Sequence, residues 1–420
     1  MSKQNKVIVE SLDLNDLMYL QGTDASVADG RNLRKFFPEK TVFQNGEKIL
    51  FRLHGRQFID MKNSALRFTV KFTGATVTAG FDTYSGSILN IFRRSRIISA
   101  TGKSISDVNN HNMLARMSAR LYRGNQYNDT LGAVIGLQGA GSYNTWSSGT
   151  EYEFVVPMRL VSPFWDNCQM LPPQISEGLQ VELFLEDLTR CGISSAGTLT
   201  KYQVLNPELI CDVVQVNPAI DSAVASMSSQ KMVYEYHDFV QIESTMSIDS
   251  GDLHLPLTYP LSNALEAFVT IRSTANANAA TKDSFATTRI TTYSSSVNDQ
   301  LVWRSGSIQL PQARAIGGAQ IYNILLNGKG ALSNNHSMDF SLKRSNFDAA
   351  NDVTNEKGWG VYFVNLRRSN LFDNSGREVS NQQSLVAEIK TAGTANNIID
   401  MYCKFLGRIV IEKNILHVEM

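Results

Sequence analysis

The sequence has no excess of either charge, few cysteines and no long apolar run. Its 420 residues carry 39 basic and 39 acidic side chains, so the formal net charge is zero. A neutral chain lacks the positive field that drives non-specific binding to nucleic acid, and we expect no sequence-specific nucleic-acid binding either. No stretch of about 18 apolar residues is present to span a membrane, and residues 1–17 lack the apolar centre of a signal peptide. We therefore expect a soluble chain that is made in the cytoplasm.

The cysteines and histidines show no spacing typical of a disulfide scaffold or a metal site. Cys168, Cys191, Cys211 and Cys403 are far apart and form no CxxC pair, so we expect reduced thiols that behave as small buried hydrophobes. The histidines share no metal-ligand spacing with one another or with a cysteine; they are His54, His111, His237, His254, His336 and His417. No Gly-x-Ser-x-Gly nucleophile motif is present. We predict no metal, no cofactor and no catalytic residue, and so a protein that is not an enzyme.

Two short segments look like binding motifs but have simpler interpretations. Residues 100–104, Ala-Thr-Gly-Lys-Ser, resemble the end of a phosphate-binding loop, but Ile97 stands where that loop needs a glycine. A hairpin turn is the better interpretation. Residues 93–96, Arg-Arg-Ser-Arg, could contact nucleic acid or an acidic neighbour, but a solvated hairpin edge is favoured.

Carboxylates and tryptophans give little sign of a carbohydrate site. Glu182, Glu186 and Asp187 lie in or next to an alternating apolar segment, which indicates a solvated strand face rather than an acid–base pair. The side chains best suited to stack on a sugar are scattered along the chain; they are Trp146, Trp165, Trp303 and Trp359. A carbohydrate-binding or glycan-active β-sandwich protein stays open as the alternative to the interpretation developed below.

Strict alternation of apolar and polar residues is the strongest positive signal. Leu66, Phe68, Val70 and Phe72 are apolar, and the residues between them are polar. This period of two is typical of a strand with one buried and one solvated face. A shift of one residue would bury Arg67, so the register of this strand is well specified.

The same kind of strand recurs through the first half of the chain. Residues 87–106 predict a β-hairpin, and residues 151–156 and 179–185 predict further strands. After the hairpin, Ser106 and Asp107 are expected to cap a helix. The apolar residues expected on one face of this helix are Val108, Met113, Leu114, Met117 and Leu121.

The second half repeats this order of elements. Its expected strands are residues 234–242, 267–272, 301–310, 361–366, 385–389 and 404–418. Pro311 is expected to start a helix that ends near Gly328. The residues expected on its inner face are Ile316, Ala319, Ile321 and either Ile324 or Leu325. A strand block, a hairpin, a helix and a further strand block thus appear twice. This pattern predicts an all-β protein made of two sandwich domains, with short helices in the connections.

Four passages, taken in this order, resemble the double jelly-roll major capsid proteins of icosahedral double-stranded DNA viruses. They are Phe-Ile-Asp followed by Asn-Ser and Leu in residues 58–66, Asn-Ile-Phe with its hairpin in residues 90–102, residues 158–185, and Arg-Ile-Val-Ile with its continuation in residues 408–418. That lineage includes adenovirus hexon, virophage, polinton-like and giant-virus capsid proteins, and the virophage and polinton-like group is the most similar. The resemblance implies two tandem eight-stranded jelly-roll β-sandwiches.

The resemblance also implies a function and a domain plan. The chain would be a structural protein of the virion, made in the host cytoplasm, whose homotrimers form pseudo-hexameric capsomers of an icosahedral capsid. Its partners would be itself, neighbouring trimers, penton and minor or cement proteins, and an internal membrane where one exists. The expected units are an N-terminal arm (residues 1–40), a first jelly roll (41–215), a linker (216–230) and a second jelly roll (231–420). A spike or minor vertex protein is a further alternative, but the repeat in two halves argues against a single jelly roll.

Overall fold

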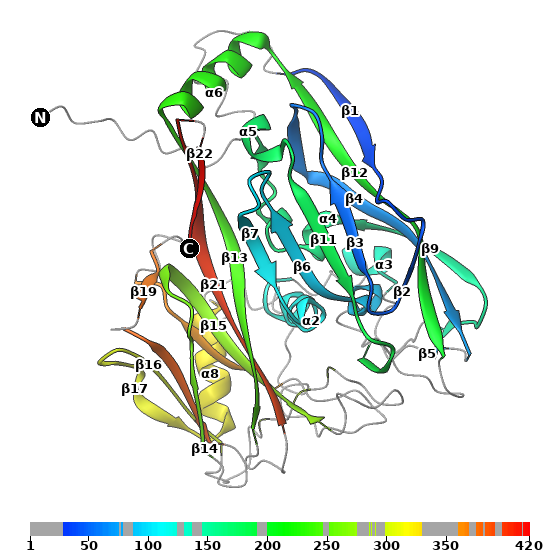
Figure 1. Ribbon diagram of the computed structural model, residues 1–420. Coiled ribbons are helices and arrows are strands. Elements are labelled where there is room, and N and C mark those ends of the chain that lie inside the picture. Colours follow the sequence, from blue (N-terminus) through cyan, green and yellow to red (C-terminus); the bar gives the residue numbers. More distant parts are fainter. Residues whose placement is uncertain are drawn as a thin grey trace, which may run out of the picture.

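The computed structural model describes most of the chain as two β-sandwiches in tandem (Figure 1). The described residues are 28–74, 77–78, 87–123, 130–136, 145–190, 200–246, 252–274, 285, 287, 290, 299–329, 360–368, 375–380, 383–390, 397–413 and 415–420. Among these residues, no helix is both long enough and apolar enough to cross a membrane. The predicted all-β double jelly-roll fold is confirmed.

Within the described residues, the first sandwich consists of a six-stranded and a four-stranded sheet. The larger sheet has the order β1-β12-β4-β10, with β2 paired to β12 and β9 paired to β4, and the smaller sheet has the order β3-β11-β6-β7. All these pairs are antiparallel. Their bounds are β1 Ala28–Phe36, β2 Val42–Gln44, β3 Lys48–Arg52, β4 Phe58–Thr73, β6 Phe92–Ile98, β7 Ser104–Val108, β9 Glu151–Pro157, β10 Met170–Leu171, β11 Gln180–Leu185 and β12 Lys201–Val216.

The second sandwich has the same arrangement. Its larger sheet has the order β13-β21-β15-β18, with β19 on β15 and β22 on β21, and its smaller sheet has the order β14-β20-β16-β17. The bounds are β13 Lys231–Met246, β14 Asp252–Pro256, β15 Leu261–Ser273, β16 Gln300–Ser305, β17 Ile308–Ile316, β18 Tyr362–Asn365, β19 Arg377–Val379, β20 Leu385–Lys390, β21 Asn397–Glu412 and β22 Ile415–Glu419. The two sandwiches therefore repeat one strand order. The order β1-β12-β4 corresponds to β13-β21-β15, and the order β3-β11-β6-β7 corresponds to β14-β20-β16-β17.

Short helices lie between the strands. In each sandwich the hairpin of the smaller sheet leads directly into a helix, α2 in the first and α8 in the second. Helix α6 joins the two sandwiches, and β5 and β8 form a separate two-stranded pair. The bounds are β5 Val77–Thr78, η1 Ser87–Ile91, α2 His111–Leu121, α3 Leu131–Val134, β8 Thr145–Trp146, α4 Met158–Val161, η3 Trp165–Asn167, α5 Pro173–Ser176, η4 Leu188–Arg190, α6 Pro218–Gln230 and α8 Gly318–Gly328.

Strand β4 confirms the clearest prediction from the sequence. Leu66, Phe68, Val70 and Phe72 are buried, while the residues between them are partly exposed. Residues 100–104 form the predicted hairpin turn between β6 and β7, where Gly102 adopts a φ of 81° and its N–H donates to the carbonyl of Ser99. The preceding residues 87–91 form a 3₁₀ turn instead of a strand.

Part of the predicted arm is an ordered edge strand. Residues 28–36 pair along β12 as β1, and residues 1–27 lie outside the described residues. The sequence of β1 shows no alternation of apolar and polar residues, because one of its inner positions is Arg34. The Arg34 guanidinium lies 5.3 Å from the ring of Phe36, the next inner residue. An edge strand is held mainly by its backbone hydrogen bonds on one side, so it needs less apolar patterning than a central strand.

Both predicted helix starts were wrong. Ser106 and Asp107 belong to β7, and α2 follows Asn110, which adopts a left-handed conformation and gives no side-chain cap. Pro311 lies in β17, and α8 begins at Gly318, so Ile316 is an exposed strand residue. Proline is tolerated in β17 because this strand is at the edge of its sheet and needs no hydrogen bond on its free side.

Candidate functional site

Helix α2 lies between the two sandwiches and contacts the core of each (Figure 1). Its small residues Ala115 and Ala119 pack on the core of the first sandwich. Its larger apolar residues join the core cluster of the second sandwich, beside Phe239 and Tyr402; they are Met113, Leu114, Met117 and Leu121. Apart from Val108, which lies in β7, the predicted apolar face of the helix is therefore confirmed, but it packs against the second domain rather than its own.

The sheet that receives α2 is buried on both faces. In β15, every residue from Ala264 to Arg272 is buried, whereas its counterpart β4 alternates between buried and partly exposed positions. Ala267 and Ile271 face the core of the second sandwich, and Arg272 on the opposite face forms a buried ion pair. The strand predicted at residues 267–272 is present, but the residues on both of its faces are buried.

Polar contacts fix the start of α2 on this sheet. The Nδ2 of Asn110 donates to Asp400 Oδ1 at 2.8 Å and also to Glu243, and the Tyr402 hydroxyl donates to the carbonyl of Asn110 at 2.9 Å. Arg272 donates to Asp400 Oδ2 through Nε at 2.9 Å, with Nη2 at 2.7 Å. Because Asp400 is fully buried, this pairing compensates for the cost of removing its charge from water.

A cluster of charges surrounds the other end of α2. Tyr122, directly after the helix, donates its hydroxyl to Glu266 at 3.0 Å, and Lys329 at the end of α8 lies 2.8 Å from the same carboxylate. Lys329 Nζ also lies 3.6 Å from the centre of the Tyr122 ring, a cation–π contact. Burial lowers the pKa of Lys329 to about 8 against the opposing effect of Glu266. Burial alone would raise the pKa of Glu266, but Lys329, Lys404 and Arg367 outweigh it and lower that pKa to about 2.

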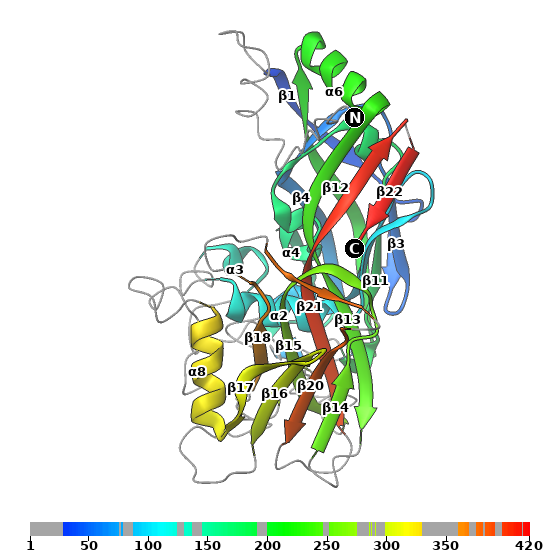
Figure 2. The ribbon, with the colours of Figure 1, turned by 90° about the vertical axis from the view of Figure 1, so that its left-hand side faces the viewer.

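The long strands of the second sandwich make a further contact with the first. Figure 2 shows β13 and β21 running from the second sandwich up alongside the first. Tyr234 and Tyr236 of β13 belong to the first core cluster, and the Tyr236 hydroxyl donates to the carbonyl of Ile105 at 2.8 Å. Asn167 and the backbone of His237 exchange two hydrogen bonds, of 2.9 and 2.6 Å. The two sandwiches therefore share a packed and hydrogen-bonded junction.

Replacement of Asn167 by Ala tests the contribution of its side-chain hydrogen bonds, namely the exchanged pair and a bond to the carbonyl of Phe164. The variant leaves the N–H and carbonyl of His237 without these partners in a mostly buried site, so we expect a loss of about 2 kcal/mol in the free energy of unfolding. Urea unfolding followed by fluorescence measures the change. Glu378→Ala, in an exposed position of β19, is the control and should unfold like the wild type. Equal midpoints for the two variants would show that the pair contributes nothing.

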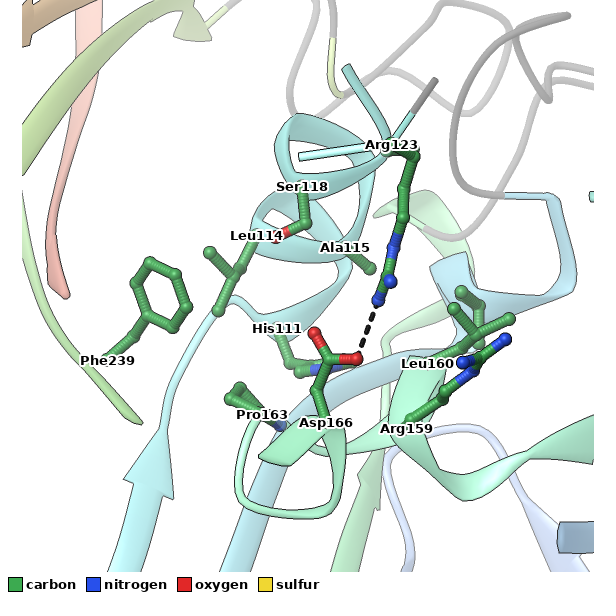
Figure 3. Close-up of a pocket in the computed structure, with 12 residues that line it drawn as sticks. His111, Leu114, Ala115, Ser118, Arg123, Arg159, Leu160, Pro163, Asp166 and Phe239 are labelled. Carbon is green, nitrogen blue, oxygen red and sulfur yellow. Dashed lines mark hydrogen bonds and ion pairs between the residues drawn. The ribbon is translucent and has the colours of Figure 1, made fainter. Parts of the chain in front are cut away.

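A small cleft opens at this junction (Figure 3). It is lined by residues of α2, by Asp166 and Arg159, and by Phe239 of the second sandwich, and its volume is about 40 Å³. Arg123 pairs with Asp166 across it at 2.8 Å. Burial lowers the pKa of His111 to about 4, so its imidazole is neutral at pH 7. A cavity of this size holds water molecules but is far smaller than a substrate pocket.

The carboxylates predicted to be solvated are largely buried. Glu182 pairs with Lys48 at 2.7 Å and with Arg96 at 3.6 Å, and only Asp187 of the three is exposed. Burial raises the pKa of Glu186, which accepts a hydrogen bond from Asn112 at 2.7 Å. The expectation of a solvated face was wrong because pairing with neighbouring strands compensates for the loss of hydration.

The other candidate residues are dispersed. In the basic segment, Arg94 and Arg96 both pair with Asp107, at 2.6 and 3.5 Å. Trp165 and Trp303 are fully buried, so neither can stack on a sugar; Trp359 and the side chain of Trp146 lie outside what the structure describes. Within the described part of the chain, no three His, Cys, Asp or Glu side chains are grouped as metal ligands.

Two of the three described cysteines are buried, as predicted. Cys211 and Cys403 are buried, and burial raises the pKa of the Cys211 thiol to about 12 and that of Cys403 as well. Cys168 is partly exposed. Cys191 lies outside the described residues.

Comparison with solved structures shows that the fold of this double sandwich is similar to that of viral capsid proteins. The Faustovirus major capsid protein matches with a TM-score of 0.63 and 10% identity, over 95% of this chain and 98% of that chain. PBCV-1 VP54, in a structure fitted into a reconstruction of the virophage Sputnik, matches with a TM-score of 0.61 and 11% identity over the same shares. The mavirus major capsid protein matches with a TM-score of 0.51 and 12% identity, over 100% of this chain and 93% of that chain.

The amino-acid sequence itself matches no protein-family model and no curated protein. The fold confirms the predicted resemblance to double jelly-roll major capsid proteins. Identities of 10–12% do not allow the roles of individual residues to be transferred.

Proposed function

We propose that this protein is the major capsid protein of a double-stranded DNA virus and that its homotrimers form the pseudo-hexameric capsomers of an icosahedral shell. The proposal depends on the observation that the two sandwiches repeat one strand order. The first has the sheets β1-β12-β4 and β3-β11-β6-β7, and the second has β13-β21-β15 and β14-β20-β16-β17. Three such chains around an axis present six similar sandwiches, so a threefold assembly fills a sixfold position.

The junction supports this assembly because it shows how one sandwich packs beside the next. The first sandwich offers α2, and the second offers the outer face of its larger sheet. Their counterparts, α8 of the second sandwich and the larger sheet of the first, also differ from each other, as cyclic head-to-tail closure between chains requires. The similarity in fold to the major capsid proteins of Faustovirus and mavirus, over nearly their full lengths, supports the same role.

The remaining assignments follow from this role. The chain acts as a structural protein rather than an enzyme, located in the virion capsid after synthesis in the host cytoplasm. Its partners are its own copies, neighbouring trimers, penton and minor or cement proteins, and an internal membrane if the virus has one. The proposed units are a first jelly roll at residues 41–215, to which β1 adds an edge strand, a second jelly roll at residues 231–420, and residues 216–230 as the link between them.

The mass of the purified protein tests the proposal. We expect a stable particle with three times the chain mass of 46.6 kDa, because trimer interfaces of the obligate kind bury roughly 2,000 Å² or more. Mass photometry at nanomolar concentration measures the mass, and negative-stain images should show hexagonal outlines. A protein that stays at the mass of one chain at all accessible concentrations contradicts the proposed capsomer.

A further inference from the structure

Helix α8 is the counterpart of α2, but it has no second sandwich to cover it. Each helix follows the hairpin of its smaller sheet. Nearly all of α2 is buried, whereas Ala319, Gln320, Asn323 and Asn327 of α8 are exposed. Figure 2 shows α8 at the outside of the second sandwich.

The composition of α8 is unusual for a surface helix. Its residues, Gly-Ala-Gln-Ile-Tyr-Asn-Ile-Leu-Leu-Asn-Gly, include no charged side chain. A helix face that stays in water normally carries charged residues, and depletion of charge is typical of an interface core. Ile316, which directly precedes the helix, adds an apolar side chain that is 48% exposed.

The larger sheet of the first sandwich is the matching uncovered surface. Its counterpart in the second sandwich is buried under α2, but the outer positions of β4 remain partly exposed. Apolar side chains lie open on and beside this sheet, with Leu33 65%, Phe37 63% and Val155 44% exposed. A cleft of about 400 Å³ lies between Phe37 and the irregular part of β12 at residues 206–208.

Several charges at the centre of this sheet are already paired with one another, so an uncharged helix suits this part of it. Arg67 pairs with Glu153 at 2.5 Å and with Glu208 at 3.4 Å, and Lys35 pairs with Glu208 at 2.9 Å. Lys71 pairs with a carboxylate of β9 in the same way. Covering pairs that are already formed leaves no buried charge without a partner.

We infer that α8, together with Ile316, docks on the outer face of the β1-β12-β4-β9 sheet of a second copy of this chain. The contact repeats between chains the packing that α2 makes within one chain. This inference rests on the proposed trimer and names its interface. Repeated three times, the contact closes a ring, because every chain has one free α8 and one free sheet.

Two variants, each damaging one surface, test the contact. Asn323→Glu places one unpaired charge on the exposed face of α8, and Phe37→Asp places one on the sheet. Both sites are exposed in the single chain, so each variant should keep the wild-type circular dichroism spectrum, while its melting temperature should fall toward that of an isolated chain because assembly adds to apparent stability. Each should associate at least about 100-fold more weakly than the wild type, since charges without partners become buried in the interface.

Mixing the two variants gives the decisive result. The Phe37→Asp chain keeps an intact α8, and the α8 variant keeps an intact sheet, so the mixture should form a one-to-one dimer that cannot close into a trimer. Sedimentation velocity measures the species. Ile415→Asp, at a site on β22 that is 57% exposed, is the control and should stay trimeric.

The outcomes separate this interface from the proposed function. A trimeric wild type whose surface variants also stay trimeric, or whose variants fail to pair when mixed, overturns the interface and leaves the capsomer standing. A wild type that does not associate at all overturns both.

Discussion

Replacing Glu266 by Gln is expected to lower the free energy of unfolding at pH 7 by about 3–5 kcal/mol, because it removes the carboxylate that pairs directly with a buried group of cations. Lys329 and Arg367 lie 2.8 and 3.1 Å from its two carboxylate oxygens, and Lys404 is close enough to lower its pKa further. Glutamine preserves the shape and an acceptor for Tyr122. The loss therefore reports the charge and not the packing.

Two comparisons define what Glu266 contributes. Asp221→Asn removes a partly exposed carboxylate that pairs with Arg56, away from the proposed interface, and we expect little change from it. Adding Lys329→Met to Glu266→Gln removes one of the stranded cations and should restore part of the stability. All unfolding curves are compared at one protein concentration, since assembly adds to apparent stability. A loss in Glu266→Gln no larger than in Asp221→Asn would contradict the role of the cluster.

The same group makes a prediction about acid. The pKa of Glu266 is about 2 in the folded chain, below the value of about 4.3 for an exposed glutamate. Its stabilising effect is therefore complete above pH 4.3 and is lost as the pH falls from about 4 to 2. Wild type and Glu266→Gln should differ in melting temperature at pH 7 and approach each other near pH 2.

The strands could be predicted from the sequence because one face of most of them is solvated. β4 shows this best, since its alternation reflects a boundary between core and water. β15 marks the limit of the method: it was recognised as a strand, but its burial on both faces depends on α2, which comes from a distant part of the sequence. β1 was missed because an edge strand with Arg34 on its inner side has no apolar period.

The junction could not be predicted for a related reason. Helix α2 carries large apolar residues on one face and Ala115 and Ala119 on the other. Because both faces lack charged residues at these positions, the sequence of the helix was compatible with a position between two layers. Asn110 gave no such sign, because its bonds to Asp400 and Glu243 join residues far apart in the sequence. Glu182 was misjudged because the sequence does not show which cation of a neighbouring strand will face a carboxylate.

Asp238 in β13 should make the protein more stable in mild acid than in mild base. Its side chain is buried at the junction, near Asp107 of β7, and its Oδ1 has no hydrogen-bond partner among the described residues. Burial, with a further contribution from Asp107, raises the pKa of Asp238 to about 7. The folded chain thus keeps a proton that the unfolded chain loses near pH 3.9.

The sign of the pH dependence follows from that difference in bound protons. Between about pH 4 and pH 7 the folded state binds more protons than the unfolded state, so the free energy of unfolding falls as the pH rises through this window and is level above it. For a difference of about three pK units the fall is at most about 4 kcal/mol.

Asp238→Asn has no proton to lose, so its free energy of unfolding should exceed that of the wild type at pH 8 and lose this advantage at pH 5. Asp221→Asn, an exposed site on α6, should keep the wild-type profile. Urea unfolding at both pH values decides the matter, and parallel profiles for wild type and Asp238→Asn would mean that the buried carboxylate does not set the stability of the junction.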